Sequence, residues 1–339
     1  MPLATRLLCL GALLLLASTT RCTPDTPPEA PDAGPPAGTH YPPIPDRTSC
    51  SGLTEGPGNH EWTLSHEGRT RTYRVHVPPG YVATKPTPVV IAFHGFGSNE
   101  LEQEGLSQMS QVADEEGFIA IYPRGLHYSE ALRSEPNPQY DDSRSWNAGG
   151  CCGPAQVYGV NDVDFVEALF ADLDKHLCVD TRRIYATGLS NGAFFAYRLA
   201  CERAARFAAI APVAGSENVL PCNPSRPVPV MHFHGTADPT IPYDGGTIPL
   251  GRPYPSAPDT VAKWAERNGC KGPIQVTYNQ GDSTCRTHTG CSAPATLCIV
   301  ENGGHTWPGG LMPPEYGYTT KSLDATREMW RFFELHPRP

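Results

Sequence analysis

One short segment, Gly188-Leu189-Ser190-Asn191-Gly192, constrains the fold of this chain more than any other feature of the sequence. It has the form G-x-S-x-G. Residues 183–187 before it are typical of a short buried strand, and residues 193–201 after it predict a helix. In such a strand–turn–helix unit the serine hydroxyl stands clear of the backbone, and glycines avoid a collision across the tight turn. This context predicts a nucleophilic Ser190, and the alternative is a Gly/Ser turn that only caps a helix.

The segments around this turn alternate between strands and helices. Residues 71–77 alternate polar and apolar, which predicts a strand with one covered face. A continuous apolar run at 88–93 predicts a parallel strand covered on both faces. Further strands are predicted at 118–122, 208–213, 228–234, 274–278 and 295–300. Helical spacing follows at 106–113, 161–177, 260–268 and 322–335. The pattern predicts one α/β domain over residues 47–339, with a mostly parallel central sheet flanked by helices.

The N-terminal region is typical of an exported protein. Arg6 and the apolar run 7–16 predict a signal peptide over residues 1–21, too short to span a bilayer. Residues 22–46 are rich in Pro, Ala and Asp and predict a disordered linker. Cys22 is a possible lipid-anchor site, although Arg21 before it is not the small residue that lipoprotein signals carry. We therefore expect a secreted protein or a surface lipoprotein, with no transmembrane segment.

The charge and the cysteines restrict the partners and the compartment. The formal charge of −9 and the lack of a basic run argue against nucleic acid as a partner. Apart from Cys9 and Cys22, ten cysteines remain, and an even number in an exported chain predicts disulfides. Spacing does not determine their connectivity. We expect Cys201–Cys222, Cys270–Cys291 and Cys285–Cys298, which leaves Cys50, Cys151, Cys152 and Cys178 to pair among themselves.

A serine nucleophile needs a base, and the base needs an acid that fixes its tautomer. In a fold of this kind the order along the chain is serine, acid, histidine. Asp238 follows the strand 228–234 and His305 follows the strand 295–300, so these two residues are the predicted acid and base. Alternatively, Asp238 only forms a turn before a proline, with Asp244 or Glu301 as the acid, and His305 only bonds to backbone.

Three further histidines, His94, His232 and His234, lie at the ends of predicted strands. They are expected to brace loops around the pocket. A metal pair at His232 and His234 is the alternative, but no third ligand is suitably spaced and no H-E-x-x-H occurs, so no metal or cofactor is expected. The oxyanion hole would use the backbone N–H of Asn191, after the nucleophile, and that of Phe96 in the turn after the strand 88–93.

Several of these segments together resemble the poly(3-hydroxybutyrate) depolymerase and feruloyl esterase family of secreted α/β-hydrolase esterases. The resemblance covers about residues 50–335 and is carried by residues 145–149, 160–165, 188–193, 234–238 and 303–309. It implies that Ser190, Asp238 and His305 form the catalytic triad. It also implies that Trp146 and Trp307 flank the substrate. Asn161 stands where the family commonly has Asp, a change that a helix cap tolerates.

The expected reaction is hydrolysis of a carboxylic ester through an acyl-enzyme. The rings of Trp307, Trp146, Phe96 and Tyr243 would offer flat apolar walls, unless they pack in the core. The substrate would be a feruloyl (or acetyl) ester of plant cell-wall polysaccharide or, alternatively, a hydroxybutyrate polyester. Two other possibilities are a serine peptidase on the same fold and a non-catalytic surface-binding protein that keeps the fold.

Overall fold

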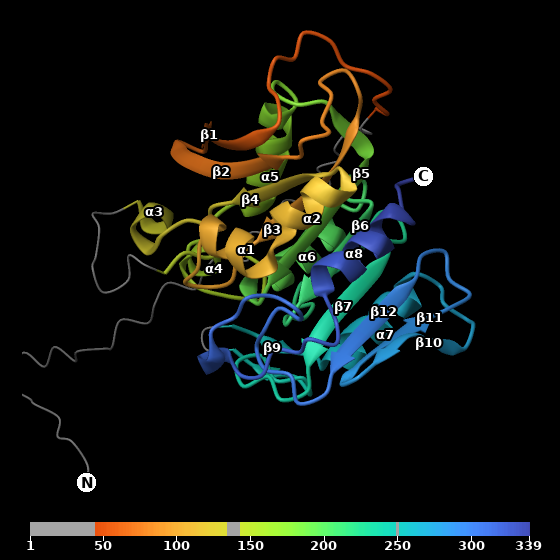
Figure 1. Cartoon of the computed structure of the whole chain (residues 1–339). Helices are drawn as coiled ribbons and strands as arrows, with labels where there is room; N and C mark the ends of the chain where they lie inside the picture. The colour runs from red at the N-terminus through yellow and green to blue at the C-terminus, as the bar shows by residue number, and fades with distance from the viewer. Residues whose placement is uncertain (1–44, 134–142, 249–250) are drawn as a thin grey trace, which may run out of the picture. The chain divides into compact units, whose positions relative to one another are not determined.

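The computed structural model describes residues 45–133, 143–248 and 251–339 (Figure 1). The predicted signal peptide, Cys22 and nearly all of the predicted linker lie outside these residues. The domain boundaries predicted at residues 21 and 46 therefore stay predictions.

Most strands of the described residues join a single sheet in the order β1-β2-β4-β3-β5-β6-β7-β12-β11-β10. The strands of this sheet are β1 (Gly58–His66), β2 (Arg69–Val77), β3 (Thr87–Phe93), β4 (Ile119–Pro123), β5 (Val179–Leu189), β6 (Ala209–Val213), β7 (Val230–Gly235), β10 (Ile274–Gln280), β11 (Ser283–His288) and β12 (Ala295–Val300). The central strands from β4 to β12 run parallel to their neighbours, while β1, β2, β11 and β10 pair antiparallel at the two sides. A small hairpin pairs β8 (Gly246–Thr247) with β9 (Pro253–Tyr254).

Helices cover both faces of the parallel strands. They are α1 (Glu100–Ser107), α2 (Met109–Glu116), α3 (Tyr128–Leu132), α4 (Pro154–Val157), α5 (Asp162–Leu173), α6 (Asn191–Glu202), α7 (Ala257–Arg267) and α8 (Ala325–Glu334), with the 3-10 helix η1 (Pro314–Tyr316). Successive residues of β3 point to opposite faces, so Val89 belongs to the buried cluster that includes residues of α5, α6 and α7, while Val90 belongs to the one that includes residues of α2 and α8. Figure 1 shows α8 in front of the central strands.

The predicted elements are present, with a few differences. The helix expected around residues 106–113 is two helices, because Gln108 between α1 and α2 is left-handed with φ 51°. The helix capped by Asn161 ends at Leu173, before Leu177. Strands β1, β8, β9 and β11 were not predicted. β1 is largely polar and lies at the edge of the sheet, where pairing with β2 rather than burial makes it a strand.

Five disulfides join the ten cysteines of the described residues. Cys201–Cys222, Cys270–Cys291 and Cys285–Cys298 confirm the predicted pairings. The remaining cysteines form Cys50–Cys178, which ties the segment before β1 to the start of β5, and Cys151–Cys152, which closes between neighbouring residues.

Candidate active site

Ser190 lies in the turn between β5 and α6 with φ 56°, a conformation that non-glycine residues rarely adopt. Its backbone N–H donates to the carbonyl of Val213 at 3.0 Å, which fixes the turn to the next strand. A Cβ on Gly188 or on Gly192 would lie 2.6 Å or 2.1 Å from the carbonyl oxygen of Phe93. The backbone therefore needs both glycines, and the turn holds a partly exposed serine at the carboxyl end of β5.

Asp238 and His305 follow the neighbouring parallel strands β7 and β12 and meet at the same edge of the sheet. Nδ1 of His305 lies 2.8 Å from Oδ2 of Asp238. The other carboxylate oxygen accepts from the backbone N–H groups of Thr240 and Ile241, both at 2.8 Å. Because Nδ1–H donates to the carboxylate, Nε2 of the neutral imidazole is left with its lone pair, as a general base requires.

The surroundings of Asp238 keep it ionised. Burial alone would raise the pKa of this carboxyl, but hydrogen bonds from His234 and His305 outweigh it and hold the pKa well below its usual value. The side chain of Asp238 is fully buried and that of His305 is 5% exposed. Because both oxygens of the buried Asp238 carboxylate accept hydrogen bonds, the orientation of the carboxylate is fixed. The His305 imidazole that is bonded to it is fixed as well. Neither Asp244 nor Glu301 takes this place.

A chain of buried hydrogen bonds runs under the acid. The Tyr197 hydroxyl lies 2.8 Å from Nδ1 of His232, and Nε2 of His232 lies 3.0 Å from Nδ1 of His234. Nε2 of His234 lies 2.7 Å from the carbonyl oxygen of Ile241 and 3.4 Å from Oδ2 of Asp238. Since that carbonyl can only accept, Nε2 of His234 carries the proton and its Nδ1 accepts. Nε2 of His232 therefore donates to His234, and the Tyr197 hydroxyl donates to Nδ1 of His232.

This chain bears on the metal alternative. Burial, with a smaller contribution from the neighbouring His234, holds the pKa of His232 well below its usual value. All four of their ring nitrogens are engaged in hydrogen bonds, and no lone pair faces a shared point. Through His234, the two histidines contact the loop that carries Asp238 and Ile241.

Another group with ligand-like spacing, Cys201, Glu217 and Cys222, occurs among the described residues. Its two sulfurs are joined in a disulfide, and its carboxylate pairs with Arg267.

The two predicted oxyanion residues come from segments that lie against Ser190. Asn191 begins α6, so its backbone N–H belongs to the first turn, where helix N–H groups have no partner within the helix. A Cβ on Gly95, just before Phe96, would lie 3.6 Å from Cβ of Ser190. The turn is braced by His94, whose Nδ1 donates to the Gly95 carbonyl at 2.7 Å and whose Nε2 accepts from Gly125 N–H at 2.9 Å. Burial lowers the pKa of His94 to about 4.

Trp146 and Trp307 were expected to flank the substrate, and this prediction is wrong because both side chains are 0% exposed. Trp146 stacks on Phe195 and donates from Nε1 to the carbonyl of His94 at 3.1 Å. Trp307 donates from Nε1 to Oγ1 of Thr326 at 2.9 Å. Each indole finds a buried acceptor for its N–H, which allows full burial in the core.

Other rings do reach the surface near the site. Phe96 is 51% exposed, and Tyr243 is half-buried beside His234. Sequence reasoning missed Tyr316, which is 41% exposed and whose ring centre lies 6.4 Å from that of His305. The backbone N–H of His305 also donates to the Tyr316 carbonyl at 2.7 Å. The Gly- and Pro-rich loop around Tyr316 has no periodicity that could have identified it.

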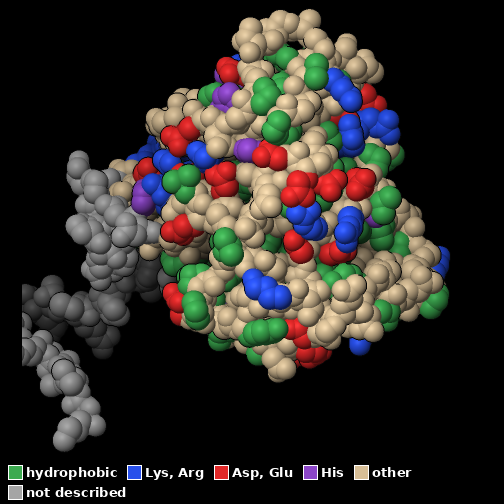
Figure 2. All heavy atoms as spheres, viewed as in Figure 1, with side chains coloured by type: hydrophobic (Ala, Val, Ile, Leu, Met, Phe, Trp, Pro, Cys, Tyr) green, Lys and Arg blue, Asp and Glu red, His purple; other side chains and the backbone are tan. Residues whose placement is uncertain are grey.

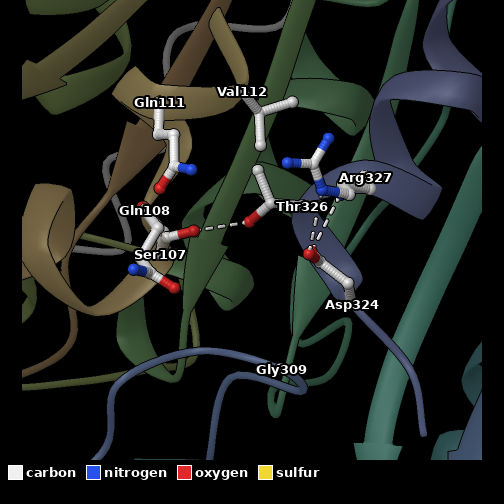
Figure 3. A pocket seen from close by; sticks show the side chains of 8 residues that line it. All are labelled: Ser107, Gln108, Gln111, Val112, Gly309, Asp324, Thr326 and Arg327. Carbon is white, nitrogen blue, oxygen red and sulfur yellow. Dashed lines mark hydrogen bonds and ion pairs between the residues drawn. The ribbon is translucent and has the colours of Figure 1, made fainter. Parts of the chain in front are cut away.

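A cavity of about 300 Å³ lies where the junction of α1 and α2 meets the start of α8 (Figure 3). Ser107, Gln108, Gln111, Val112, Gly309, Asp324, Thr326 and Arg327 line it. The guanidinium of Arg327 pairs with Glu115 and Asp324, and Thr326 donates to the Ser107 carbonyl. None of the predicted catalytic residues lines this cavity.

On the face drawn in Figure 2, acidic and basic side chains are interspersed.

Comparison with known proteins gives consistent matches. The family model described as esterase PHB depolymerase matches residues 71–262. Feruloyl esterase B of Piromyces equi is 29% identical over 249 residues, which are 70% of this chain and 43% of that protein, so the chain spans less than half of this relative. A protein named as an esterase, NocK, from Nocardia uniformis subsp. tsuyamanensis is 30% identical over 89% of this chain and 90% of its own length.

Solved structures agree on the fold. An acetyl xylan esterase from Aspergillus awamori has a TM-score of 0.50 and 16% identity, covering 81% of this chain and 99% of its own. A ferulic acid esterase from Anaeromyces mucronatus has a TM-score of 0.50 and 14% identity, covering 86% and 98%. At these identities the likeness concerns the fold alone, and it confirms the predicted α/β-hydrolase fold.

Proposed function

Because this chain belongs to the esterase PHB depolymerase family and is a carboxylic ester hydrolase, we propose that Ser190, His305 and Asp238 carry out its reaction. The observation that carries the proposal is the 2.8 Å hydrogen bond from His305 to the buried Asp238, at the sheet edge where the strained turn also presents Ser190. Two residues more than 60 positions apart are held in the orientation that a catalytic base needs.

In the proposed mechanism, Oγ of Ser190 attacks the ester carbonyl while Nε2 of His305 takes the hydroxyl proton. The oxyanion is stabilised by the backbone N–H groups of Asn191 and Phe96. The bond from the carbonyl carbon to the alcohol oxygen then breaks, and the alcohol leaves with the proton from His305. Water, deprotonated by the same imidazole, attacks the acyl-enzyme and releases the acid and Ser190. Asp238 stays ionised throughout and stabilises the imidazolium that forms in each half-reaction.

We propose a feruloyl ester of plant cell-wall polysaccharide as the substrate. Relatives named as feruloyl esterases support an aromatic acyl group, as do the exposed rings of Phe96 and Tyr316 near the site. The polyester alternative is favoured by the description of the family itself, esterase PHB depolymerase. Release of ferulate from methyl ferulate, compared with clearing of a poly(3-hydroxybutyrate) emulsion, separates the two.

We also propose that the protein is exported, since its five disulfides suit an oxidising compartment. None of the helices in the described ranges has the length and apolar character that crossing a bilayer requires. Cys22 stays a candidate for a lipid anchor, and metabolic labelling of wild type and Cys22→Ala with an alkyne fatty acid tests it.

The test of the triad is an ester panel on wild type and Ser190→Ala, combined with labelling by a fluorophosphonate. We expect the variant to lose about 10⁴-fold or more in kcat and to lose the label, with an unchanged circular dichroism spectrum. Asp238→Asn is a further variant in the ester panel. Its matched control is Asp244→Asn, because Asp244 is exposed and the carboxyl of Asp238 is buried. Equal turnover by wild type and Ser190→Ala would refute the proposal.

A further inference from the structure

We propose that the Cys151–Cys152 disulfide and the Phe96 ring form one wall of the substrate site, on which a flat aromatic acyl group lies. This inference rests on the proposed function of Ser190. It assigns the disulfide a part in substrate selection in addition to closing the loop between β4 and α5.

The disulfide is held directly against the nucleophile turn. Nδ2 of Asn191, the residue after Ser190, lies 3.4 Å from Sγ of Cys152 and 3.7 Å from Sγ of Cys151. The same amide pairs with the backbone of Trp146, donating to its carbonyl at 3.0 Å and accepting its N–H at 2.7 Å. Since Asn191 is fully buried, these contacts hold the loop that carries the disulfide in one position relative to Ser190.

Phe96 connects the other side of the disulfide to the nucleophile. A Cβ on Gly153, the residue after Cys152, would lie 2.6 Å from the Phe96 ring, so the ring packs directly over this backbone. The residue before Phe96, Gly95, lies against Ser190. The contacts therefore connect Ser190 to the disulfide on two sides, through Asn191 on one side and through Gly95 and Phe96 on the other.

The groups of this set that reach the surface are apolar. Cys151 is fully buried, while Cys152 is partly exposed and Phe96 is 51% exposed. A disulfide sulfur makes no demand for a strong hydrogen bond, and polarisable sulfur contacts aromatic rings favourably at about 5 Å. The Phe96 ring adds the geometry for offset or edge-to-face packing. A planar aromatic acyl group would cover both groups, whereas an acetyl group is too small to do so.

The test compares kcat/KM for methyl ferulate with kcat/KM for 4-nitrophenyl acetate. We expect Cys151→Ala/Cys152→Ala to lower the ratio of the two values about tenfold, through a higher KM for ferulate. The matched control is Cys270→Ala/Cys291→Ala, which also removes one disulfide. That disulfide joins the end of α7 to the loop after β11. It should leave the ratio within about twofold of wild type.

Phe96→Ala provides a second test that does not depend on a disulfide, since an exposed ring contributes little to folding. It should lower the same ratio, and combining it with the double cysteine variant should lower it by less than the product of the two effects. If the ratio is unchanged in Phe96→Ala and in a folded double cysteine variant, the proposal that the disulfide and the Phe96 ring contact the acyl group is refuted. If the double cysteine variant does not fold, Phe96→Ala decides alone. A wild type without turnover of either ester instead refutes the proposed function.

Discussion

His94 gives a prediction whose size follows from the structure. The imidazole is fully buried below the turn that carries Phe96, and it donates to one backbone group and accepts from another. The acceptor nitrogen must stay unprotonated to hold the N–H of Gly125. Burial lowers the pKa of His94 to about 4 from the 6.5 of an unfolded chain.

The depressed pKa links stability to pH in one direction. Above pH 6.5 the imidazole is neutral in both states, and its contribution to stability is fully present. As the pH falls from 6.5 to about 4, the unfolded chain binds a proton that the folded chain does not, so the free energy of unfolding decreases. Between pH 7.5 and 4.5 the loss is RT ln[(1 + 10^2)/(1 + 10^−0.5)], or about 2.5 kcal/mol.

The assay is urea unfolding, with the disulfides intact, of wild type and His94→Gln at pH 7.5, 6.0 and 4.5, followed by tryptophan fluorescence. Glutamine keeps an acceptor and a donor but does not titrate, and the other titrating groups are common to both proteins. We expect the stability advantage of wild type over the variant to shrink by about 2.5 kcal/mol between pH 7.5 and 4.5. An advantage constant within about 0.5 kcal/mol would refute the buried neutral imidazole.

Three other expectations follow from buried contacts. Tyr197→Phe removes the first donor of the histidine chain and should lower the free energy of unfolding by about 1–3 kcal/mol in urea titrations, with kcat/KM within about threefold of wild type. Asp162→Ala leaves the Arg71 guanidinium buried without its partner at 2.7 Å and should cost about 3–5 kcal/mol, whereas Asp174→Ala at the surface should cost less than about 1 kcal/mol. Trp307→Phe should destabilise the protein by about 1–3 kcal/mol, seen as a lower Tm, yet leave KM for methyl ferulate within about twofold, because the ring does not reach the surface.

The sequence predicted the parallel strands and the turn at Ser190 because their constraints are local. A Cβ at Gly188 or Gly192 collides with the backbone of β3, so the turn requires glycine at both positions. Parallel strands covered on both faces are largely apolar, which makes them recognisable in the sequence. Asp238 and His305 were predictable from their places after such strands, since the carboxyl ends of neighbouring parallel strands meet at one edge.

The side-chain surroundings were not predictable in the same way. Whether Trp146 lies in the core depends on Phe195 and Asn191, which are more than 40 positions away in the chain. The exposure of Tyr316 depends on its 3-10 turn beside His305. A tryptophan in a polar loop resembles a surface residue in sequence, and its burial becomes apparent only when the acceptor for its N–H is known.

With the roles proposed above, the residues that carry out the reaction and those that select the substrate lie in different parts of the fold. The groups proposed to move protons are fixed by buried contacts, since Asp238 accepts from backbone N–H groups and a buried histidine lies under it. The groups proposed to contact the acyl chain, Phe96, Cys152 and Tyr316, belong to loops and leave part of their surface exposed. Changes in these loops could alter the preferred ester without disturbing the base, because none of the three contributes a hydrogen bond to the Asp238 carboxylate. On this argument, substitutions of Phe96, Cys152 or Tyr316 should change the ratio between substrates, and substitutions of Asp238 itself should lower the rates for all of them together.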